Sequence, residues 1–560
     1  MVRIEHWNNR ILCRYTPYVM KDILKALPDA RWERKEKAWS FAAVPEAALA
    51  LVSLFPEHNT DDEIIILIDK KKEQDAAQEL KTVPVSNLQD FETDTEPWEH
   101  QKRAFWFARS VLEATGGCML GMEMGCGKTK VAIDLTVNMP DVSTVLVTSP
   151  LSVVPVWPEQ YALHAHKHYD ISVLPLGYGV KSVRHKQRAA ERFLSKADSR
   201  DLSVVVVNHE SLWREPFGMF AKDFPWDMII VDEIHRAKSA GGKFSQYLSS
   251  LRDRIRYRLG LTGTIMPHSP IDPYAQYRFL DIGLFGSSFI RYKNKFTITE
   301  PIVVNGQKIS KIIGFKNLDV LEKKMASCTY VVKSDDVLDL PEINDIYLKC
   351  DLSDSERRVY ERMEKDLIAA ISEGAVVTAA NQLVRLLRLQ QIVQGTVKDE
   401  DGNKHEIGTT KEDVLRDLLL DLPSDEPVVV FCLFHSDLDR VHRVCKAVGR
   451  NSFEISGRRE KQNKEWQRAE GGEVLAAQFK AGSEGVDYTR SRYMAFMCGT
   501  FNMGQYWQAR KREHRPGQRR TCFYYHLFAR NTIDAKVYQS LRDKEKVVES
   551  VIRGIQKGEM

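Results

Sequence analysis

Apolar runs alternate with stretches of helical periodicity through the middle of the chain. Continuous runs of this length are typical of strands buried on both faces, and helices between them favour a parallel sheet. The pattern therefore predicts an α/β lobe whose strands end together at one edge, where ligands bind in such sheets. The predicted strands are Ser143 to Thr148, Leu202 to Val207, Met228 to Val231 and Tyr257 to Leu261.

The same kind of pattern returns further along the chain. Pro427 to Cys432 and Val474 to Phe479 are again apolar and predict a second α/β lobe, followed by a charged helix from Thr532 to Gly558. Between the lobes, Ser353 to Ile371 and Ala379 to Val393 have helical periodicity. Two further stretches between the lobes are predicted to be irregular or β-like: Phe285 to Tyr292 and Asn294 to Phe315.

The first part of the chain predicts a small α+β module. Trp32 and Trp39 lie among several basic residues there. This pattern is compatible with a nucleic-acid contact, in which the basic residues bind phosphates and the tryptophans stack on bases, or with a small domain whose core contains the tryptophans and whose charged residues face solvent. The next stretch is polar and predicts a linker, with a possible strand at Ile64 to Ile68. The predicted domains are residues 1–57 (α+β module), 58–91 (linker), 92–290 (first lobe), 291–408 (inter-lobe insertion), 409–530 (second lobe) and 531–560 (final helix).

Composition and charge narrow the class of protein. The chain has 560 residues, 28% of them charged, with a net charge of only +4, so any nucleic-acid binding depends on local patches. Nine cysteines without a Cys-x-x-Cys pair predict reduced thiols and no zinc site. No run approaches the ~18 apolar residues of a membrane span, and the amino terminus carries charge at once. We therefore expect an intracellular protein without membrane contact.

A glycine-broken loop joins an apolar run to a helix near residue 125. Gly125 and Gly127 permit a nest of backbone N–H groups, Lys128 adds charge for the β and γ phosphates, and Thr129 supplies a hydroxyl for magnesium. The pattern predicts binding of ATP and Mg²⁺, although Gly-x-Gly-Lys-Thr alone also occurs as a turn before an ordinary helix. Met122 departs from the strict pattern, which has glycine there.

Two acidic residues follow the strand Met228 to Val231. Asp232 is predicted to face the metal, and Glu233 to orient and deprotonate the water that attacks the γ phosphate. The alternative is a solvated acidic turn. Upstream of the loop, the amide of Gln101 is able to pair with an adenine edge, although a single Gln is usually only a surface residue.

Polar residues also end the other predicted strands of both lobes. In the first lobe they follow the apolar runs directly, and in the second lobe glycines permit close approach to a phosphate. We expect this group to contact nucleic acid: Ser149, Pro150, Asn208, His209, Thr262, Thr264, Gly482, Ser483 and Gly485.

Four segments together resemble the Swi/Snf-type ATPases of helicase superfamily two. They are Glu123 to Thr129, Asp232-Glu-Ile-His235, Leu261-Thr-Gly-Thr264 and Gln508-Ala-Arg-Lys-Arg-Glu-His-Arg-Pro-Gly-Gln518. The resemblance covers about residues 92 to 545 and implies two tandem RecA-like lobes that hydrolyse ATP between them and translocate along double-stranded or branched DNA. The module at residues 1–57 is similar to the HARP domain of annealing-helicase relatives. The family usually has Asn-Leu at Asp487-Tyr488.

The last of these segments supplies the predicted contribution of the second lobe. Gln508, Arg512 and Arg515 fall at i, i+4 and i+7, which predicts one helical face, and Pro516-Gly517 would end that helix. Guanidinium groups on this face would complete the ATP site, and such groups are worth roughly 10³ to 10⁵ in rate. The alternative is a basic solvated helix.

Two other functions are compatible with parts of the sequence. One is an Asp-Glu-x-His RNA helicase, against which the segment Arg512 to Gln518 argues. The other is a non-enzymatic DNA-binding or recruitment protein with an inert nucleotide pocket, against which the full set of catalytic groups argues. We expect a bacterial cytoplasm, the host cytoplasm for a viral protein, or the nucleus for a eukaryotic one.

Overall fold

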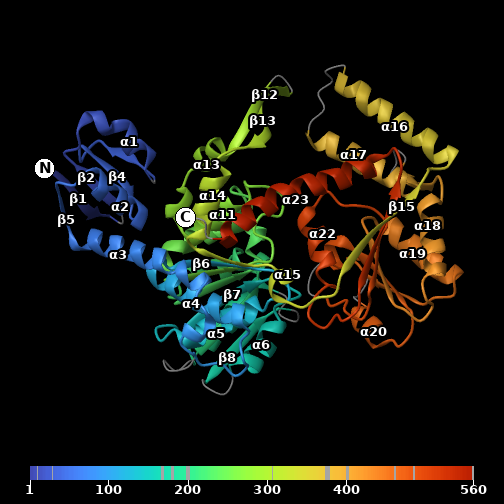
Figure 1. Ribbon diagram of the computed structural model, residues 1–560, viewed down its shortest axis with the longest axis horizontal. Coiled ribbons are helices and arrows are strands. Elements are labelled where there is room, and N and C mark those ends of the chain that lie inside the picture. Colours follow the sequence, from blue (N-terminus) through green and yellow to red (C-terminus); the bar gives the residue numbers. More distant parts are fainter. Residues whose placement is uncertain are drawn as a thin grey trace. The chain divides into compact units, whose positions relative to one another are not determined.

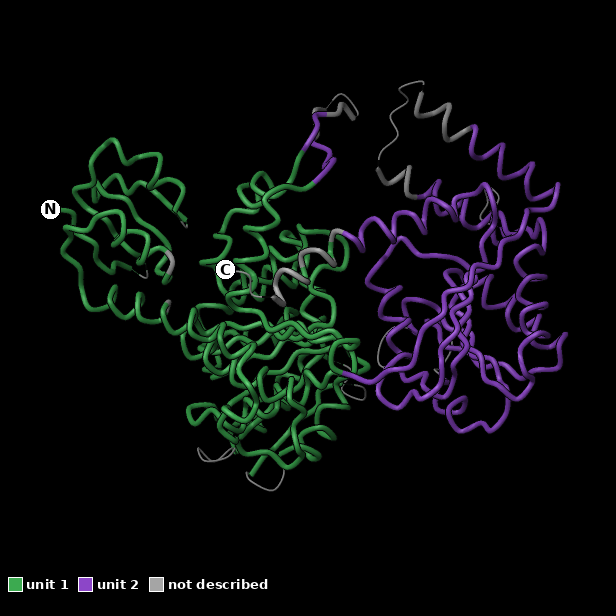
Figure 2. The backbone as a smooth tube through the Cα atoms, viewed as in Figure 1, with its two compact units in different colours: residues 1–298, 315–337, 548–560 green, residues 299–314, 338–547 purple. Residues whose placement is uncertain are grey.

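The chain folds into two compact units (Figure 2). The computed structural model describes residues 1–560 except 9, 28, 166–169, 178–181, 197–201, 305–306, 373–378, 399–402, 459–461, 483–485 and 558–560. Unit 1 comprises residues 1–298, 315–337 and 548–560, and unit 2 comprises residues 299–314 and 338–547. The domain boundaries predicted from the sequence stay predictions.

The first 60 residues form the predicted α+β module, which we call the N-terminal module. Its sheet has the order β3-β4-β2-β1-β5 and packs on α2, with Ile4, Ile11 and Phe41 fully buried. Trp39 belongs to this core, whereas Trp32 is half exposed and meets it edge to face at 5.5 Å. The elements are β1 (Val2–Trp7), β2 (Arg10–Arg14), α1 (Lys21–Ala26), β3 (Arg31–Glu33), β4 (Ala38–Ala42), α2 (Pro45–Leu54) and β5 (His58–Thr60).

The strand considered for Ile64 to Ile68 is wrong. Residues Asp62–Ala76 form helix α3, which leads from the N-terminal module to the first lobe (Figure 1). Asp61 caps the helix by accepting the Ile64 N–H at 3.1 Å, and two acidic residues in the first turn favour the positive end of the helix dipole. Ile64 is buried while Ile65 is half exposed, as expected for neighbours on a helix that packs on one side.

The predicted parallel sheet of the first lobe is confirmed. Its order is β14-β6-β11-β10-β7-β9-β8, and neighbouring strands run parallel to each other. The strands are β6 (Gly117–Met122), β7 (Thr144–Ser149), β8 (Ile171–Leu176), β9 (Leu202–Asn208), β10 (Met228–Asp232), β11 (Tyr257–Leu261) and β14 (Thr329–Val332). The helices are α4 (Glu99–Thr115), α5 (Lys128–Asn138), α6 (Val156–His164), α7 (Val183–Leu194), α8 (His209–Leu212), α9 (Phe217–Asp223), α10 (Lys243–Leu251) and α11 (Pro273–Leu280).

A second parallel sheet, in unit 2, is also confirmed. Its order is β15-β22-β21-β18-β20-β19, and its apolar strands pack against helices α18 and α19. The strands are β15 (Ile343–Cys350), β18 (Val428–Cys432), β19 (Ser452–Ile455), β20 (Val474–Gln478), β21 (Tyr493–Phe496) and β22 (Cys522–Ala529). The helices are α18 (Thr410–Asp421), α19 (His435–Ala447), α20 (Asn463–Arg468), α21 (Phe479–Gly482), α22 (Met503–Arg510) and α23 (Ile533–Lys557). The fold is therefore α/β with two RecA-like parallel sheets.

The segment between the two sheets is more regular than predicted. Phe285 to Tyr292 is not irregular or β-like, because helices α12 (Ile282–Phe285) and α13 (Phe289–Phe296) occupy it, with Ser288 capping α13. Hairpin β12 (Thr297–Val304) and β13 (Gln307–Phe315) matches the β-like prediction for the stretch that follows. The other elements are α14 (Leu318–Ala326), α15 (Ser334–Val337), α16 (Asp354–Ser372), α17 (Ala379–Val393), β16 (Thr396–Lys398) and β17 (Lys404–Glu406).

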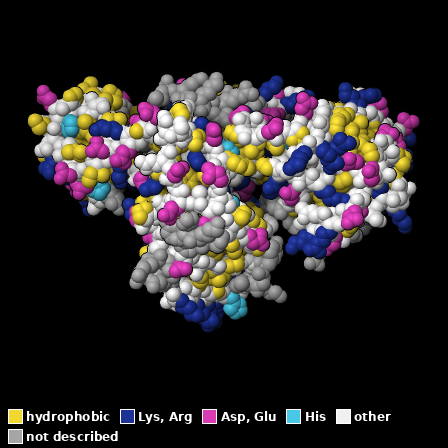
Figure 3. Space-filling view, turned by 60° about the horizontal axis from the view of Figure 1, so that its bottom comes forward, with side chains coloured by type: hydrophobic (Ala, Val, Ile, Leu, Met, Phe, Trp, Pro, Cys, Tyr) yellow, Lys and Arg dark blue, Asp and Glu magenta, His cyan; other side chains and the backbone are white. Residues whose placement is uncertain are grey.

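The surface carries both signs of charge. Lysine and arginine side chains are interspersed with aspartate and glutamate over the face in Figure 3, in keeping with the net charge of +4. Among the helices that the structure describes, none is both long and apolar enough to cross a membrane.

Candidate nucleotide and nucleic-acid sites

The predicted phosphate loop lies between β6 and α5. Gly125 and Gly127 both have left-handed backbones, with φ of +85° and +80°. At Gly127 the left-handed backbone disfavours a side chain, and a Cβ atom would lie 2.1 Å from Nε2 of Gln101 and would displace the end of that side chain. Lys128 opens helix α5, whose amino end is thus directed at the loop. The local geometry fits a cradle for phosphate.

The first turn of α4 supports this loop from one side. Gln101 accepts the Trp98 N–H through Oε1 and donates to the Cys126 carbonyl through Nε2 at 3.2 Å. Nε2 of His100 lies 2.9 Å from the same carbonyl. Both polar ends of Gln101 are therefore engaged within the chain, and its contact with adenine stays a prediction.

Glu123 anchors the loop from the other side, a role that the sequence analysis missed. Its N–H donates to the Val332 carbonyl at 2.9 Å, and its Oε2 accepts the Ser334 N–H at 3.1 Å and the Ser334 hydroxyl at 2.6 Å. Met122, which departs from the motif, is fully buried as the last residue of β6. An apolar side chain at this position is therefore buried in the lobe.

The acidic pair lies at the end of β10, two strands from the loop in the sheet order. Glu233 has a left-handed backbone, with φ of +50°, and its N–H donates to Oδ1 of Asp232 at 3.0 Å. Burial, followed by the charge of Glu233, raises the pKa of Asp232 to about 7, while the Lys128 charge opposes the shift. Two buried carboxylates at one strand end call for a cation between them.

A polar chain connects Glu233 to the next strand end. Nδ1 of His235 lies 3.1 Å from Oε2 of Glu233 and 3.0 Å from Oγ1 of Thr262. Oγ1 of Thr262 also accepts the Thr264 N–H at 3.0 Å. Gly263 lies beside the phosphate loop, since a Cβ there would approach Met124 N at 3.4 Å. The structure therefore brings three of the four family-like segments to one edge of the first sheet.

The other strand-end residues of the first lobe lie at the same edge, but their side chains bond inward. Asn208 accepts from Lys186 Nζ at 2.7 Å and donates to Glu210, while Nδ1 of His209 lies 2.9 Å from the Thr148 hydroxyl. Ser149 is fully buried and donates to the Pro150 carbonyl. Their contacts with nucleic acid stay predictions.

In unit 2, Gly482 ends α21 in a crowded position. Its carbonyl accepts the Tyr488 hydroxyl at 2.7 Å, and a Cβ would lie 2.9 Å from that of Ala477. Ser483 and Gly485, also predicted to contact nucleic acid, lie outside the described residues.

The predicted shared helical face of Gln508, Arg512 and Arg515 is wrong. Helix α22 ends at Arg510, so Gln508 lies on it while Arg512 and Arg515 lie in the turns that follow. The Arg512 carbonyl accepts the Tyr488 N–H at 3.0 Å, and Nη1 of Arg515 lies 3.6 Å from Asp487. The catalytic part predicted for these residues stays a prediction.

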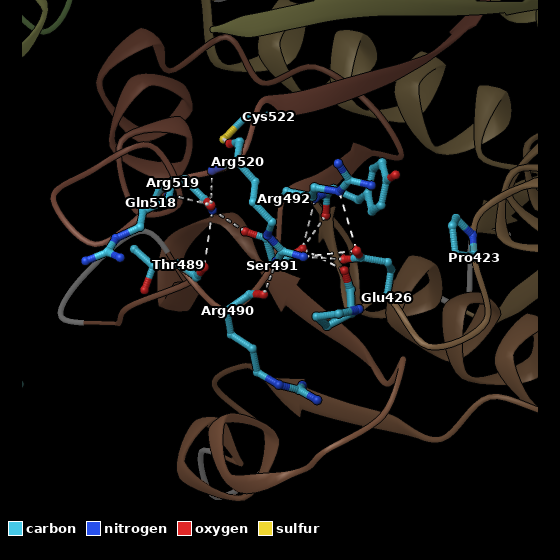
Figure 4. Close-up of polar contacts among 12 residues, drawn as sticks. Pro423, Glu426, Thr489, Arg490, Ser491, Arg492, Gln518, Arg519, Arg520 and Cys522 are labelled. Atoms are coloured by element: carbon cyan, nitrogen blue, oxygen red, sulfur yellow. Dashed lines mark hydrogen bonds and ion pairs between the residues drawn. The ribbon is translucent and has the colours of Figure 1, made fainter. Parts of the chain in front are cut away.

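The rest of this segment holds unit 2 together. Gln518 donates to the Thr489 and Ser491 carbonyls and accepts the N–H groups of Arg519 and Arg520 (Figure 4). Arg520 in turn forms two 3.0 Å contacts with the carboxylate of Glu426.

Arg510, within the same motif, is a structural residue that the sequence analysis did not single out. It donates twice to Asp345 on β15, at 2.6 and 2.8 Å, and packs over the rings of Tyr506, Trp507 and Tyr524. The pair joins residues 165 positions apart, which no local pattern indicates.

A phosphate loop and an acidic pair on one parallel sheet, with a second parallel sheet bearing the arginine-rich motif, are the features of a two-lobed helicase-like fold. Residues 100–397 match the SNF2-related domain and residues 410–517 match the helicase conserved C-terminal domain. The chain belongs to the SNF2-related family, the Swi/Snf-type ATPases of helicase superfamily two.

Similar proteins come from bacteria, a phage and eukaryotes. An uncharacterized ATP-dependent helicase of Mycoplasma genitalium is 22% identical over 465 residues, covering 81% of this chain and 42% of that protein. Putative protein p41 of Acyrthosiphon pisum secondary endosymbiont phage 1 is 23% identical, covering 78% of this chain and 94% of that protein. The human DNA repair and recombination protein RAD54-like is 22% identical, covering 79% of this chain and 64% of that protein.

Among solved structures, the chain is similar to the Sulfolobus solfataricus SWI2/SNF2 ATPase core in complex with dsDNA. Sequence identity is 20% and the TM-score is 0.37, with 84% of this chain and 96% of that chain covered.

Proposed function

We propose that the chain is a DNA-dependent ATPase that hydrolyses ATP between its two lobes and uses the cycle to translocate along duplex DNA. The observation that carries this proposal is that the phosphate loop, the acidic pair and the loop from Thr262 to Thr264 lie together at one edge of the first sheet. An inert DNA-binding protein has no need for a buried, linked set of catalytic groups at that edge.

Each group of the first lobe has a distinct part in this proposal. Gly125, Gly127 and Lys128 hold the phosphates of ATP, and Gln101 contacts the adenine after exchanging its bonds to the loop. Glu233 takes a proton from the attacking water, and His235 beside it orients that carboxylate. The polar chain through Thr262 then links the state of Glu233 to the loop that ends at Thr264.

The hydroxyl of Thr129 and the carboxylate of Asp232 are the residues that would hold Mg²⁺. They fit this ion because both offer hard oxygen atoms, and because a bound cation would favour the ionised form of Asp232, which burial and Glu233 disfavour. When bound, Mg²⁺ neutralises charge on the β and γ phosphates.

The second lobe supplies the remaining groups. Gln508, Arg512 and Arg515 complete the ATP site, which makes hydrolysis depend on closure of the lobes. Strand-end residues of both lobes follow the DNA backbone: Ser149, Pro150, Asn208, His209, Thr262, Thr264, Gly482, Ser483 and Gly485.

We further propose that the DNA is duplex or branched and that the chain remodels or anneals forks in replication, repair or recombination. The names of the relatives support this, since they include a helicase and a DNA repair and recombination protein. The N-terminal module, similar to a HARP domain, is the part proposed to prefer branched DNA.

An ATPase assay across linear duplex, forked and single-stranded DNA and RNA tests the proposal. We expect the strongest stimulation with duplex or forked DNA, whereas the strongest stimulation with RNA would support an RNA helicase instead. Deleting residues 1–57 should remove a preference for forks over linear duplex. An unchanged preference would show that the module is a structural cap.

A further inference from the structure

A groove of about 1130 Å³ lies in unit 1 at the opposite edge of the first sheet from the phosphate loop. Residues just before the amino ends of β6 and β11, Thr115 and Arg256, line it on one side. On the other side it is lined by Arg31 of the N-terminal module and by Ile66 of α3. Of the described residues that line it, none belongs to the predicted ATP site, and Arg31 is one of the basic residues near Trp32 and Trp39 considered above for phosphate contact.

The lining is strongly biased towards positive charge. Among the described residues, it contains eight Lys or Arg side chains and four Asp or Glu side chains, and no Phe, Tyr or Trp. Four of the arginines alternate along one segment of the chain: Arg252, Arg254, Arg256 and Arg258. Several cations from one short segment give the groove a concentration of positive charge, which favours contact with phosphates.

Within the part of the chain that the structure describes, the side chains of two of these arginines, Arg258 and Arg278, donate to neutral oxygen atoms, although the charges of Asp281 and Asp253 also act on Arg258. Arg258 is 9% exposed and donates to the carbonyls of five residues, Thr115, Arg252, Ile255, Arg256 and Leu280, none of them a carboxylate. Burial lowers its pKa to about 10, so the guanidinium keeps its charge at neutral pH. Arg278 donates to the Ser249 hydroxyl and the Ala240 carbonyl. The groove therefore has a net positive charge, which favours the binding of an anion.

Asp29 holds the two walls of the groove together. It accepts from Arg10 and Arg31 of its own module at 2.8 Å each, and from the Ser287 hydroxyl beyond α12 at 2.9 Å. These bonds outweigh the effect of burial and lower the pKa of Asp29, so it stays ionised near neutral pH. The groove is thus formed by contacts within unit 1 and needs no ligand to assemble.

We propose that this groove binds the phosphodiester backbone of a nucleic-acid strand. It would be a second contact surface, separate from the edge of the first sheet that carries the phosphate loop. Its volume exceeds the roughly 300 to 1,000 Å³ of small-molecule pockets, which favours a polymer. The absence of aromatic side chains from its lining favours contact with phosphates over stacking on bases. Binding here is independent of sequence and sensitive to salt.

Three exposed arginines provide the test. Arg31, Arg254 and Arg256 have side chains 56%, 56% and 65% exposed, so replacing them with Gln removes charge with little effect on folding. The matched control replaces Arg184, Arg188 and Arg192 with Gln, since these lie on the surface of α7, outside the groove. Thermal melting of both variants checks that the fold is kept.

The measurement is the affinity of the full-length chain for labelled single-stranded and duplex oligonucleotides, without nucleotide, over a range of salt. We expect the groove variant to bind about tenfold more weakly than the control. The slope of log binding constant against log salt concentration should become shallower by about 0.7 per lost phosphate contact on single strands and by about 0.9 on duplex. The oligonucleotide that shows the larger loss of affinity, single-stranded or duplex, is the form of nucleic acid that binds in the groove.

Equal affinities of the groove variant and the control would overturn the proposal. A groove variant that loses binding of a polyglutamate peptide but keeps oligonucleotide binding would also overturn it, in favour of an acidic peptide. ATP hydrolysis at saturating DNA should be the same in the groove variant and the wild type. If the wild-type chain hydrolyses no ATP yet shows the groove effect, the groove proposal stands and the ATPase proposal fails.

Discussion

Nδ1 of His235 lies 3.0 Å from Oγ1 of Thr262, which places a polar bridge between the ends of the neighbouring strands β10 and β11. The same nitrogen lies 3.1 Å from the carboxylate of Glu233. A change in the position or charge of Glu233 therefore alters the contacts of the loop from Thr262 to Thr264, and a change in that loop alters the contacts of Glu233.

Replacing Thr262 with Val should slow DNA-stimulated hydrolysis with little change in ATP affinity. The variant keeps the shape of the side chain but removes its contact with His235, and misplacing a catalytic group by ~1 Å costs up to about 10²-fold in rate. Steady-state hydrolysis and equilibrium ATP binding separate the two effects. Thr82→Val is the control, since that exposed hydroxyl bonds only within its own turn. An unchanged rate in Thr262→Val would show that the bridge only supports the fold.

Replacing Gly127 with Ala should weaken ATP binding. The new methyl group displaces Nε2 of Gln101 from the Cys126 carbonyl, and the backbone is forced to stay left-handed. Gly449→Ala is the matched control, because Gly449 has a similar φ of +73° but open space around it. We expect the control to lose about 1–2 kcal/mol of stability and to bind ATP normally. Equal ATP binding by both variants would contradict the steric account of the loop.

Replacing Asp345 with Ala should destabilise unit 2. It removes the two-bond partner of Arg510 and leaves a guanidinium that is only 8% exposed without its carboxylate. We expect a cost of about 2–3 kcal/mol in denaturant unfolding, below the full cost for a buried pair because Asp345 is itself 35% exposed. Asp351→Ala, which breaks the exposed pair with Arg530, should cost less than about 1 kcal/mol. Equal costs would contradict the structural role given to Arg510.

Glu454 should make stability depend on acid pH. Burial alone would raise its pKa, but bonds from Arg458, Ser456 and His442 lower it to about 2, from 4.5 when unfolded. A carboxyl with a lowered folded pKa stabilises the fold above its unfolded pKa, and this contribution is lost as the pH falls from about 4.5 to about 2. The wild type should therefore exceed Glu454→Gln by up to about 3 kcal/mol at neutral pH and lose that advantage in acid. A difference that is constant with pH in unfolding experiments would contradict this assignment.

Features set by local sequence could be predicted. The strands Met228 to Val231 and Pro427 to Cys432 were visible as apolar runs, and the left-handed Gly125 and Gly127 followed from a loop that only glycine fits. The place of Asp232 and Glu233 beside this loop followed from the rule that parallel strands end at one edge.

Features set by distant contacts could not be predicted. Helix α3 is different, because its signals are local: the run Ile64 to Ile68 has no clear period, and the cap at Asp61 and the acidic first turn were its only marks. Helix α22 ends at Arg510, and nothing local to the motif indicated that Arg510 pairs with a residue on another strand. The anchoring of the phosphate loop by Glu123 and Ser334 likewise joins segments 211 residues apart.

The most direct test of the ATPase proposal is phosphate release by Glu233→Gln with saturating duplex DNA. We expect hydrolysis to fall by about 10² to 10⁴-fold while ATP binding is kept, and Lys128→Ala to lose binding as well. Phosphate release by Glu233→Gln at the wild-type rate would contradict the account.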